Sequence, residues 1–248
     1  HLTLNELFFY EHVVVDEAQD LHGSHWRLLR SVVPEGPNDM FIVGDSDQRI
    51  YDNRASLDVA GIKISDRSAH LWINYRTSIE IADWASSLLG ERRITRIEGA
   101  DQHEGSKYKS FMHGPEPTMK KTLSEHDLSS LLSMQIQKWI DQGVSPEDIV
   151  VASRSRRLHP SITSSLELSG IPHSIRTIAV LDNPGVQVST MHTLKGHEFR
   201  CVALFGVGDE QVPAPWLLEE YAHNEENLSQ FLDRECSLLY MAATRARD

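Results

Sequence analysis

The sequence predicts an α/β fold made of two units with parallel sheets. Short apolar runs alternate with segments of helical periodicity in both halves of the chain, a pattern typical of parallel α/β units. The run Val13–Val15, which leads straight into two acidic residues, is typical of a fully buried parallel strand. Residues 98–108 are polar, contain glycine and show no period, so we place the boundary between the units there.

The first half shows both kinds of element in turn. The segment that follows His22 has Trp26, Leu29 and Val33 at helical spacing and ends before Pro34. The expected elements are an amphipathic segment at 4–10, strands at 12–16, 40–44 and 71–73, and helices at 22–33 and 78–89.

The second half repeats the alternation and is expected to be the more complete unit. Ser124 and Asp127 have the spacing of a capping box ahead of an apolar helical face. The expected elements are short strands near Phe111 and at 118–123, strands at 149–152, 186–190 and 201–205, and helices at 124–140, 157–169 and 227–247.

The composition is that of an ordinary soluble protein, and the 248 residues suffice for two modest domains. A net charge of −12 argues against coating DNA by bulk electrostatics, although it leaves room for a local basic track. No apolar run has the length of a membrane span and no signal-peptide pattern is present, so we expect a cytoplasmic protein. Cys201 and Cys236 form no disulfide framework or metal pattern, and Cys201 is expected to be buried.

The acidic residues after the first strand are candidates for metal and phosphate chemistry. Ligands of an open α/β sheet bind at the carboxyl ends of the strands, where Asp16 and Glu17 lie. Asp16 can hold Mg²⁺, which prefers one or two carboxylates together with phosphate oxygens. Glu17, a second candidate metal ligand, can orient and deprotonate a water that attacks a phosphate. The structural alternative is an acidic turn in which Asp20 caps the next helix.

Five motifs follow one another along the chain and together resemble one protein family. They are the segments 13–20 (VVVDEAQD), 43–51 (VGDSDQRIY), 74–76 (NYR), 188–199 (VSTMHTLKGHEF) and 239–247 (LYMAATRAR). In this order they resemble the superfamily 1 DNA helicases of the UvrD/Rep/PcrA family, over almost the whole chain. Five motifs in the family's order are far more specific than any one of them.

The resemblance implies two RecA-like domains of the P-loop NTPase fold, residues 1–100 and 109–248, the first of them incomplete, with ATP and Mg²⁺ bound between them. It implies that Gln48 senses the γ-phosphate, that Tyr75 stacks on the adenine and that Glu198 binds the ribose. Arg76 and Arg245 match the two arginines that contact the γ-phosphate. The residues assigned to ATP, Mg²⁺ and catalysis are Asp16, Glu17, Gln48, Tyr75, Arg76, Gly196, Glu198 and Arg245.

Each assignment has a structural alternative. Arg76 and Arg245 could be surface salt-bridge partners, Tyr75 a core residue, and Gln48 the cap of a turn.

The resemblance also implies contacts with single-stranded DNA. Thr190 and His192 lie in the motif that touches the backbone of the strand, and Tyr51 and Arg54 are assigned to the DNA as well. For Thr190 and His192, a place in the core remains a full alternative. The basic residues at 154, 156 and 157 fit a track along a DNA backbone and equally a solvated helix start.

The sequence departs from the family in three places. It contains no Gly-x-x-x-x-Gly-Lys-Ser/Thr phosphate loop, so we expect a fragment of a longer polypeptide that does not hydrolyse ATP alone. Without the strand that precedes this loop, the strands at 13–15 and 41–43 lack cover, and the first unit should be less stable or use another chain. Asn53 stands where the family has a base-stacking aromatic residue, and the short link 176–185 leaves no room for a large accessory domain.

The leading hypothesis is an ATP-driven motor on single-stranded DNA, running 3′ to 5′ if it follows the family. The alternatives are a degenerate scaffold or regulatory module that binds DNA or a protein partner without turnover, and a nucleotide switch unrelated to DNA.

Overall fold

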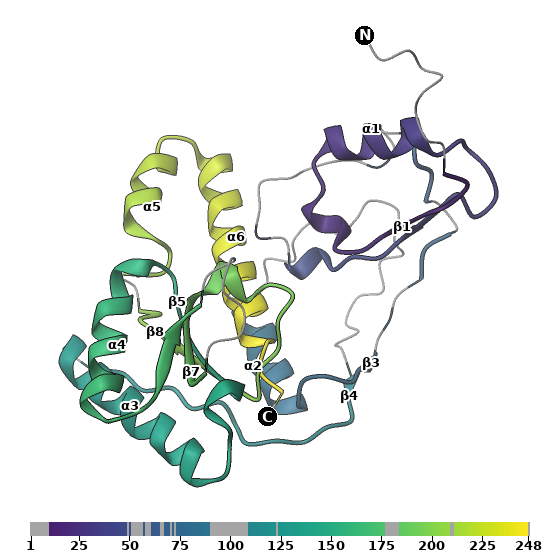
Figure 1. Cartoon of the computed structure of the whole chain (residues 1–248). Coiled ribbons are helices and arrows are strands. Elements are labelled where there is room, and N and C mark those ends of the chain that lie inside the picture. Colours follow the sequence, from purple (N-terminus) through teal and green to yellow (C-terminus); the bar gives the residue numbers. More distant parts are fainter. Residues whose placement is uncertain are drawn as a thin grey trace. The chain divides into compact units, whose positions relative to one another are not determined.

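The computed structural model describes residues 10–48, 50, 57, 61–64, 67–69, 71, 73–89, 109–122, 124–176, 184–208 and 211–247. The chain divides into two compact units, drawn in Figure 1. Unit 1 comprises His1–Leu71 and Arg92–Ser106, and unit 2 comprises Trp72–Glu91 and Lys107–Asp248. Each unit contains a parallel sheet, which confirms the predicted α/β fold with parallel sheets.

The sequence predicted a boundary between the units near residue 100, and the structure divides the chain differently. The segment at 72–91 groups with unit 2 because its helix α2 (Ile79–Leu88) packs against α6 (Glu225–Ala243). The fully buried Ala85 contacts Tyr240 and Ala243 of α6 in this cluster. The strand β3 (Ile73–Asn74) also pairs in parallel with β4 (Lys109–Ser110).

Unit 1 contains two parallel strands joined by a helix. β1 (Val13–Val15) pairs with β2 (Met40–Ile42), and α1 (Gly23–Val32) lies between them in sequence. A small core gathers Val15, Trp26 and Ile62. The N-cap of α1 is His22, whose side chain accepts the Ser24 amide, whereas Asp20 belongs to the preceding short 3₁₀ helix, Ala18–Asp20. The alternative that Asp20 caps this helix is therefore wrong.

One face of the β1–β2 pair is exposed. Val14 and Phe41 are register partners, and they are 73% and 64% exposed respectively. Apolar strand residues of this size are normally covered by another layer. The exposed face agrees with the expectation that these two strands lack cover, and the lower stability of unit 1 stays a prediction.

Unit 2 contains a four-stranded parallel sheet with the strand order β6-β7-β5-β8. These strands are His173–Ile175, Val186–Thr190, Ile149–Ser153 and Cys201–Phe205. α3 (Glu125–Asp141) and α4 (His159–Leu168) form the main core with one face of the sheet. Since Phe205 joins this core whereas Leu204 packs with α2 and α6, the latter two helices cover the opposite face (Figure 1). Cys201 is buried, as predicted.

The ends of several elements follow local sequence signals, and others depart from the expectation. The hydroxyl of Ser124 accepts the Asp127 amide and caps α3, as its spacing predicts. The short strand expected near Phe111 is formed as β4, which ends at Ser110, whereas the strand expected at 118–123 is not formed in the described residues, since 111–122 are irregular. Pro115 and Pro117 prevent β4 from continuing toward this segment, because proline cannot donate to a sheet ladder, and Met119 within it is 77% exposed.

The remaining helices flank the second unit's sheet. α5 (Pro215–Tyr221) packs on α6, where the rings of Tyr221 and Phe231 stack with centroids 5.0 Å apart. Among the helices in the described parts of the chain, none combines the length and apolar character that crossing a membrane requires. The amphipathic segment expected at 4–10 lies outside the described residues except for Tyr10.

Candidate functional site

The carboxyl end of β1 presents the two predicted acids in unit 1. Asp16 is exposed, and its Oδ1 accepts the Glu17 amide at 2.8 Å. Glu17 has a left-handed backbone with φ of 51°, which costs an ordinary residue about 1–2 kcal/mol. Its Oε2 accepts a hydrogen bond from Gln19 Nε2 at 2.5 Å. A strained conformation that persists at a strand end is typical of functional positions.

Gln19 joins the carboxyl ends of the two strands, although the sequence analysis did not single it out. It is buried, and its Oε1 accepts the Asp45 amide at 2.9 Å while its Nε2 donates to Glu17. A Cβ on Gly44 would lie 2.8 Å from Gln19 Oε1, so glycine is needed for this close approach. A glutamine within an acidic turn was the signal that could have identified it.

The end of β2 positions Gln48. Asp45 holds the turn after this strand: its Oδ1 accepts the Asp47 amide at 3.0 Å and its Oδ2 accepts Gln48 Nε2 at 2.9 Å. Because β1 and β2 are parallel neighbours, Asp16, Glu17 and Gln48 occupy the same edge of the sheet. Tyr51 and Arg54 lie outside the described residues.

Asp16 and Glu17 fit the binding of a magnesium ion that accompanies a phosphate substrate. Within the described ranges, no group of three or more His, Cys, Asp or Glu side chains forms a metal cluster. Mg²⁺ in such sites needs only one or two carboxylates, since phosphate oxygens and waters complete its shell. The exposed Asp16, with one oxygen engaged by a backbone amide, fits this mode, and Glu17 is its neighbour.

In unit 2, a tight turn carries Tyr75 and Arg76. Asn74 Oδ1 accepts the amides of Arg76 at 2.8 Å and Thr77 at 3.2 Å, which makes an Asx-turn. Ser78 then caps α2 by accepting the Ile81 amide. Tyr75 is 74% exposed, so the alternative that it belongs to the core is wrong.

Arg76 and Glu198, two predicted nucleotide-binding residues, form an ion pair. Arg76 Nε lies 3.1 Å from Glu198 Oε2, and both side chains are about half exposed. The salt-bridge alternative for Arg76 is therefore realised in this state of the protein, and its partner is another candidate site residue.

Backbone hydrogen bonds join three of the predicted motifs into one wall. Phe199 donates to the Arg245 carbonyl at 2.9 Å and accepts from the Arg247 amide at 3.1 Å, which makes a short parallel bridge between Phe199 and Ala246. The Arg247 carbonyl in turn accepts the Ser78 amide at 3.3 Å. This wall, formed by the segments 74–78, 196–199 and 244–247, brings Tyr75, Arg76, Gly196, Glu198 and Arg245 together.

Arg245 lies inside this wall. It is 2% exposed, and its Nε donates to the Met241 carbonyl at 3.1 Å, so it is no ordinary surface salt-bridge partner. Burial lowers the pKa of His197 below its ordinary value, and the nearby guanidinium groups of Arg176 and Arg245 lower this pKa further. The guanidinium carbon of Arg176, a residue the sequence analysis missed, lies 5.6 Å from the centre of the Phe199 ring.

The carboxyl ends of β5 and β7 hold the predicted DNA-binding residues. The hydroxyls of Thr190 and Thr193 lie 2.9 Å apart, and His192 belongs to the 3₁₀ helix Met191–Leu194 that follows β7. Burial lowers the pKa of His192, the neighbouring Arg154 lowers it further, and Glu235 opposes the shift. His192 is partly buried, and these effects together favour its neutral form.

The basic cluster at 154–157 divides into two parts. Arg154 forms a nearly buried bidentate pair with Glu235 of α6. Arg156 and Arg157 are exposed in the short 3₁₀ helix Arg156–Leu158 that precedes α4. The alternative of a solvated helix start therefore holds for Arg156 and Arg157 and is wrong for Arg154.

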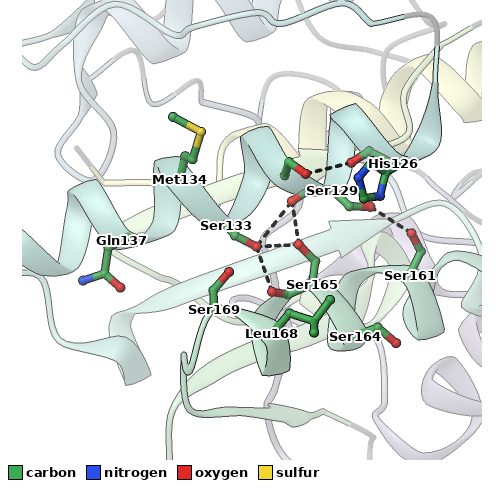
Figure 2. A pocket seen from close by; sticks show the side chains of 11 residues that line it. His126, Ser129, Ser133, Met134, Gln137, Ser161, Ser164, Ser165, Leu168 and Ser169 are labelled. Atoms are coloured by element: carbon green, nitrogen blue, oxygen red, sulfur yellow. Dashed lines mark hydrogen bonds between the residues drawn. The ribbon is translucent and has the colours of Figure 1, made fainter.

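A groove of about 650 Å³ lies elsewhere, between α3 and α4. Figure 2 shows hydroxyl groups of the two helices turned toward one another: Ser129 and Ser161 lie 2.9 Å apart, and Ser133 and Ser165 lie 2.5 Å apart. The exposed Met134 and Leu168 also line it. None of the predicted site residues lines this groove.

Comparisons with known proteins match both ends of the chain. The model of the UvrD/REP helicase N-terminal domain matches residues 6–62, and that of the UvrD-like helicase C-terminal domain matches residues 175–248. The first range contains the acids and Gln48, and the second contains Thr190, His192, Glu198 and Arg245.

Curated relatives are DNA helicases of greater length. The ATP-dependent DNA helicase UvrD1 of Mycobacterium leprae is 26% identical over 220 residues, covering 75% of this chain and 27% of its own. DNA helicase II of Haemophilus influenzae is 27% identical over 67% of this chain and 22% of its own, and a probable DNA helicase of Mycoplasma pneumoniae is 24% identical over 95% and 42%. This chain thus spans about a quarter of the length of the first two.

A solved C-terminal domain of a possible DNA helicase from Lactobacillus plantarum shows a weak likeness. It aligns with a TM-score of 0.43 at 18% identity, over 70% of this chain and 83% of that one.

The two matched helicase domains, in the order in which the five motifs run, place this chain in the UvrD-like family of superfamily 1 DNA helicases.

Proposed function

We propose that this chain is part of an ATP-dependent motor that moves on single-stranded DNA. The observation that carries the proposal is the wall of unit 2, in which an ion pair joins Arg76 and Glu198 and backbone hydrogen bonds join their segments to that of Arg245. Phosphoryl transfer depends on positioned charges more than on covalent chemistry, and such a wall supplies them. Movement in the 3′ to 5′ direction is part of the proposal and follows the family resemblance.

Unit 1 would supply the acidic side of the chemistry. Asp16 would hold Mg²⁺, which would supply positive charge to the phosphate when bound. Glu17 would orient the attacking water and accept its proton. Gln48, which donates to Asp45 in the turn after β2, would respond to the γ-phosphate.

Unit 2 would supply the nucleotide-binding side chains and the cations. The exposed ring of Tyr75 is available for stacking on the adenine. Glu198 would accept hydrogen bonds from the ribose hydroxyls, and Arg76 and Arg245 would neutralise the γ-phosphate. Arginines in this role contribute about 10³–10⁵ in rate, so each is expected to be essential for turnover.

The carboxyl end of the unit 2 sheet would contact the strand. Thr190 and His192 can donate hydrogen bonds to phosphate oxygens, and Arg156 and Arg157, which follow the neighbouring strand β5, add exposed positive charge. Tyr51 and Arg54 complete the proposed set in unit 1. A few local cations are compatible with a net charge of −12, because strand contacts need only a local track.

The test is ATP turnover by the full-length polypeptide, with and without a single-stranded oligonucleotide. We expect stimulation by the strand, and a loss of about 10²–10⁴-fold in Glu17→Gln with nucleotide binding retained, because only the general base is removed. Glu11→Gln, an exposed change ahead of β1, is the control and should be neutral. Turnover that is indifferent to the strand would contradict the proposal and favour a nucleotide switch unrelated to DNA.

A second candidate is a scaffold that binds DNA or a protein partner without turnover. The observation in its favour is that no phosphate loop with its lysine occurs in this sequence. We therefore propose that this chain, by itself, does not turn over ATP at a useful rate. Full-length protein that binds the strand but hydrolyses no ATP would support the scaffold and reject the motor.

A further inference from the structure

A nearly buried ion pair connects the strand-binding end of unit 2 with α6. Arg154 follows β5 directly, and Glu235 lies within α6, so the partners are 81 residues apart in sequence. Arg154 Nε donates to Glu235 Oε2 at 2.8 Å, and Nη2 donates to Oε1 at 2.7 Å. The two side chains are only 11% and 7% exposed.

Such a pair is poor support for stability alone. Two charges lose much of their hydration when they are buried, and their attraction often does no more than offset that loss. Replacement of a buried ion pair by apolar side chains of similar volume is often neutral or even stabilising. The Arg154–Glu235 pair is therefore better explained by the groups that it holds in position than by a gain in stability.

The location of the Arg154–Glu235 pair indicates which groups it holds in position. Ser153 is the register partner of Thr190, so Arg154 and His192 emerge at the same carboxyl edge of the sheet. His192 lies in the 3₁₀ helix that directly follows β7, the strand beside β5, and the charges of Arg154 and Glu235 both influence its pKa. The pair uses Nε and Nη2 of the guanidinium, and Nη1 takes no part in it.

The helix that holds Glu235 also leads to the nucleotide side of unit 2. α6 ends at Ala243, and Arg245 follows it with its Nε on the Met241 carbonyl. Glu235 lies eight positions before this end, which corresponds to about 12 Å of helix. One rigid element therefore connects the edge that holds Thr190 and His192 with the wall that holds Arg245.

We propose that Glu235 is a positioning residue for strand binding. It holds the Arg154 guanidinium in a fixed place beside His192, and it ties α6 to the edge that would meet the strand's phosphates. The inference rests on the proposed function, because it assumes that this edge contacts a single strand.

The experiment measures binding of a fluorescein-labelled oligo(dT) to this chain by anisotropy, at two salt concentrations. Glu235→Gln removes one negative charge, so bulk electrostatics alone would tighten binding. The proposal gives the opposite sign: affinity falls by fivefold or more, because the guanidinium is no longer fixed. Glu225→Gln, an equal charge change at an exposed position of the same helix, is the control and should change affinity by less than twofold.

A charge swap separates positioning from folding. Arg154→Glu combined with Glu235→Arg keeps an ion pair and should recover most of the melting temperature that either single change loses. Affinity should stay at least fivefold below the unaltered chain, since a carboxylate now lies beside His192.

Three results would overturn the inference. Binding by Glu235→Gln that equals or exceeds that of the unaltered chain rejects it alone, as does a charge swap that restores both stability and affinity. Absence of strand binding by the unaltered chain also rejects the inference, whereas the proposed function is tested separately by ATP turnover of the full-length polypeptide. If Glu235→Gln does not fold, the swapped chain decides.

Discussion

Two nearly identical apolar runs, one in each unit, differ in how deeply they are buried. Val13–Val15 forms β1 of unit 1, and Ile149–Val151 begins β5 of unit 2. All three residues of the second run are fully buried, whereas Val14 is largely exposed. β5 has a strand on either side and helices against its sheet, whereas β1 pairs with β2 alone among the described residues. The sequence of a run therefore determines that it becomes a strand, and its neighbours determine what it buries.

The largest expected effect concerns the core of unit 2. Leu166→Ala should lower the free energy of unfolding by about 2–5 kcal/mol, because Leu166 is fully buried and a cavity would remain. Leu168→Ala, two positions along the same helix at an 89% exposed residue, is the matched control and should be nearly neutral. Urea unfolding measures both. Equal losses in the two variants would contradict the assignment of α4's buried face.

Next comes the junction of the strands in unit 1. Gln19→Ala should destabilise unit 1 by about 1–3 kcal/mol, because it leaves the Asp45 amide without its acceptor. Faster hydrogen exchange at Val13–Val15 and Met40–Ile42 would report the loss, with β5 and β7 of unit 2 unchanged. Gln137→Ala, which removes an exposed bond to Asp141, serves as the control. Uniformly faster exchange in both units would show that they do not open independently.

A smaller effect depends on pH and belongs to unit 2. Hydrogen bonds from His113 and from the Gly114 amide lower the pKa of Glu80 from 4.5 to about 2. A carboxyl whose pKa is lower in the folded state stabilises the fold above its unfolded pKa. This contribution is lost as the pH falls from about 4.5 to about 2. The melting temperature of Glu80→Gln should lose this part of the acid dependence. If the melting temperature of this variant depended on acidic pH in the same way as that of the unaltered chain, the prediction would be wrong.

The smallest effect is expected for the ion pair between Arg76 and Glu198. Both side chains are about half exposed, so a double-mutant cycle without nucleotide should give at most about 1 kcal/mol. High salt should reduce the coupling further. A coupling several times larger would mean that the wall of unit 2 is held by this pair as well as by its backbone bonds.

Local signals in the sequence account for most of the elements. The cap at Ser124, the buried run at 149–152 and the end of helix α1 before Pro34 all follow from residues within one turn. The strand expected at 118–123 did not form in the described residues, because Met119 there is 77% exposed and the lysines at 120 and 121 follow it, so the segment has little apolar surface to bury. The grouping of α2 with α6 could not be predicted, since it depends on packing between residues about 155 apart, such as Ala85 and Tyr240.

The candidate site divides in the same way. Motif order identified Asp16, Glu17, Gln48, Arg76 and Arg245 without any knowledge of distances. Gln19 lies within the first motif but received no role there, and Arg176 and Glu235 lie outside all five motifs. The roles of these three residues arise only from partners that folding brings near. A pattern of residue types cannot reveal a pairing that depends on side-chain geometry between distant segments.

The bridge between Phe199 and Ala246 has a consequence for genetics. Because Ser78, Phe199 and Arg247 share one chain of backbone bonds, a lesion in any of their three segments displaces the other two. Substitutions there will not combine additively, as residues within one network generally do not. A harmful change in the Asn74 turn and another beside Thr244 should together be little worse than either alone.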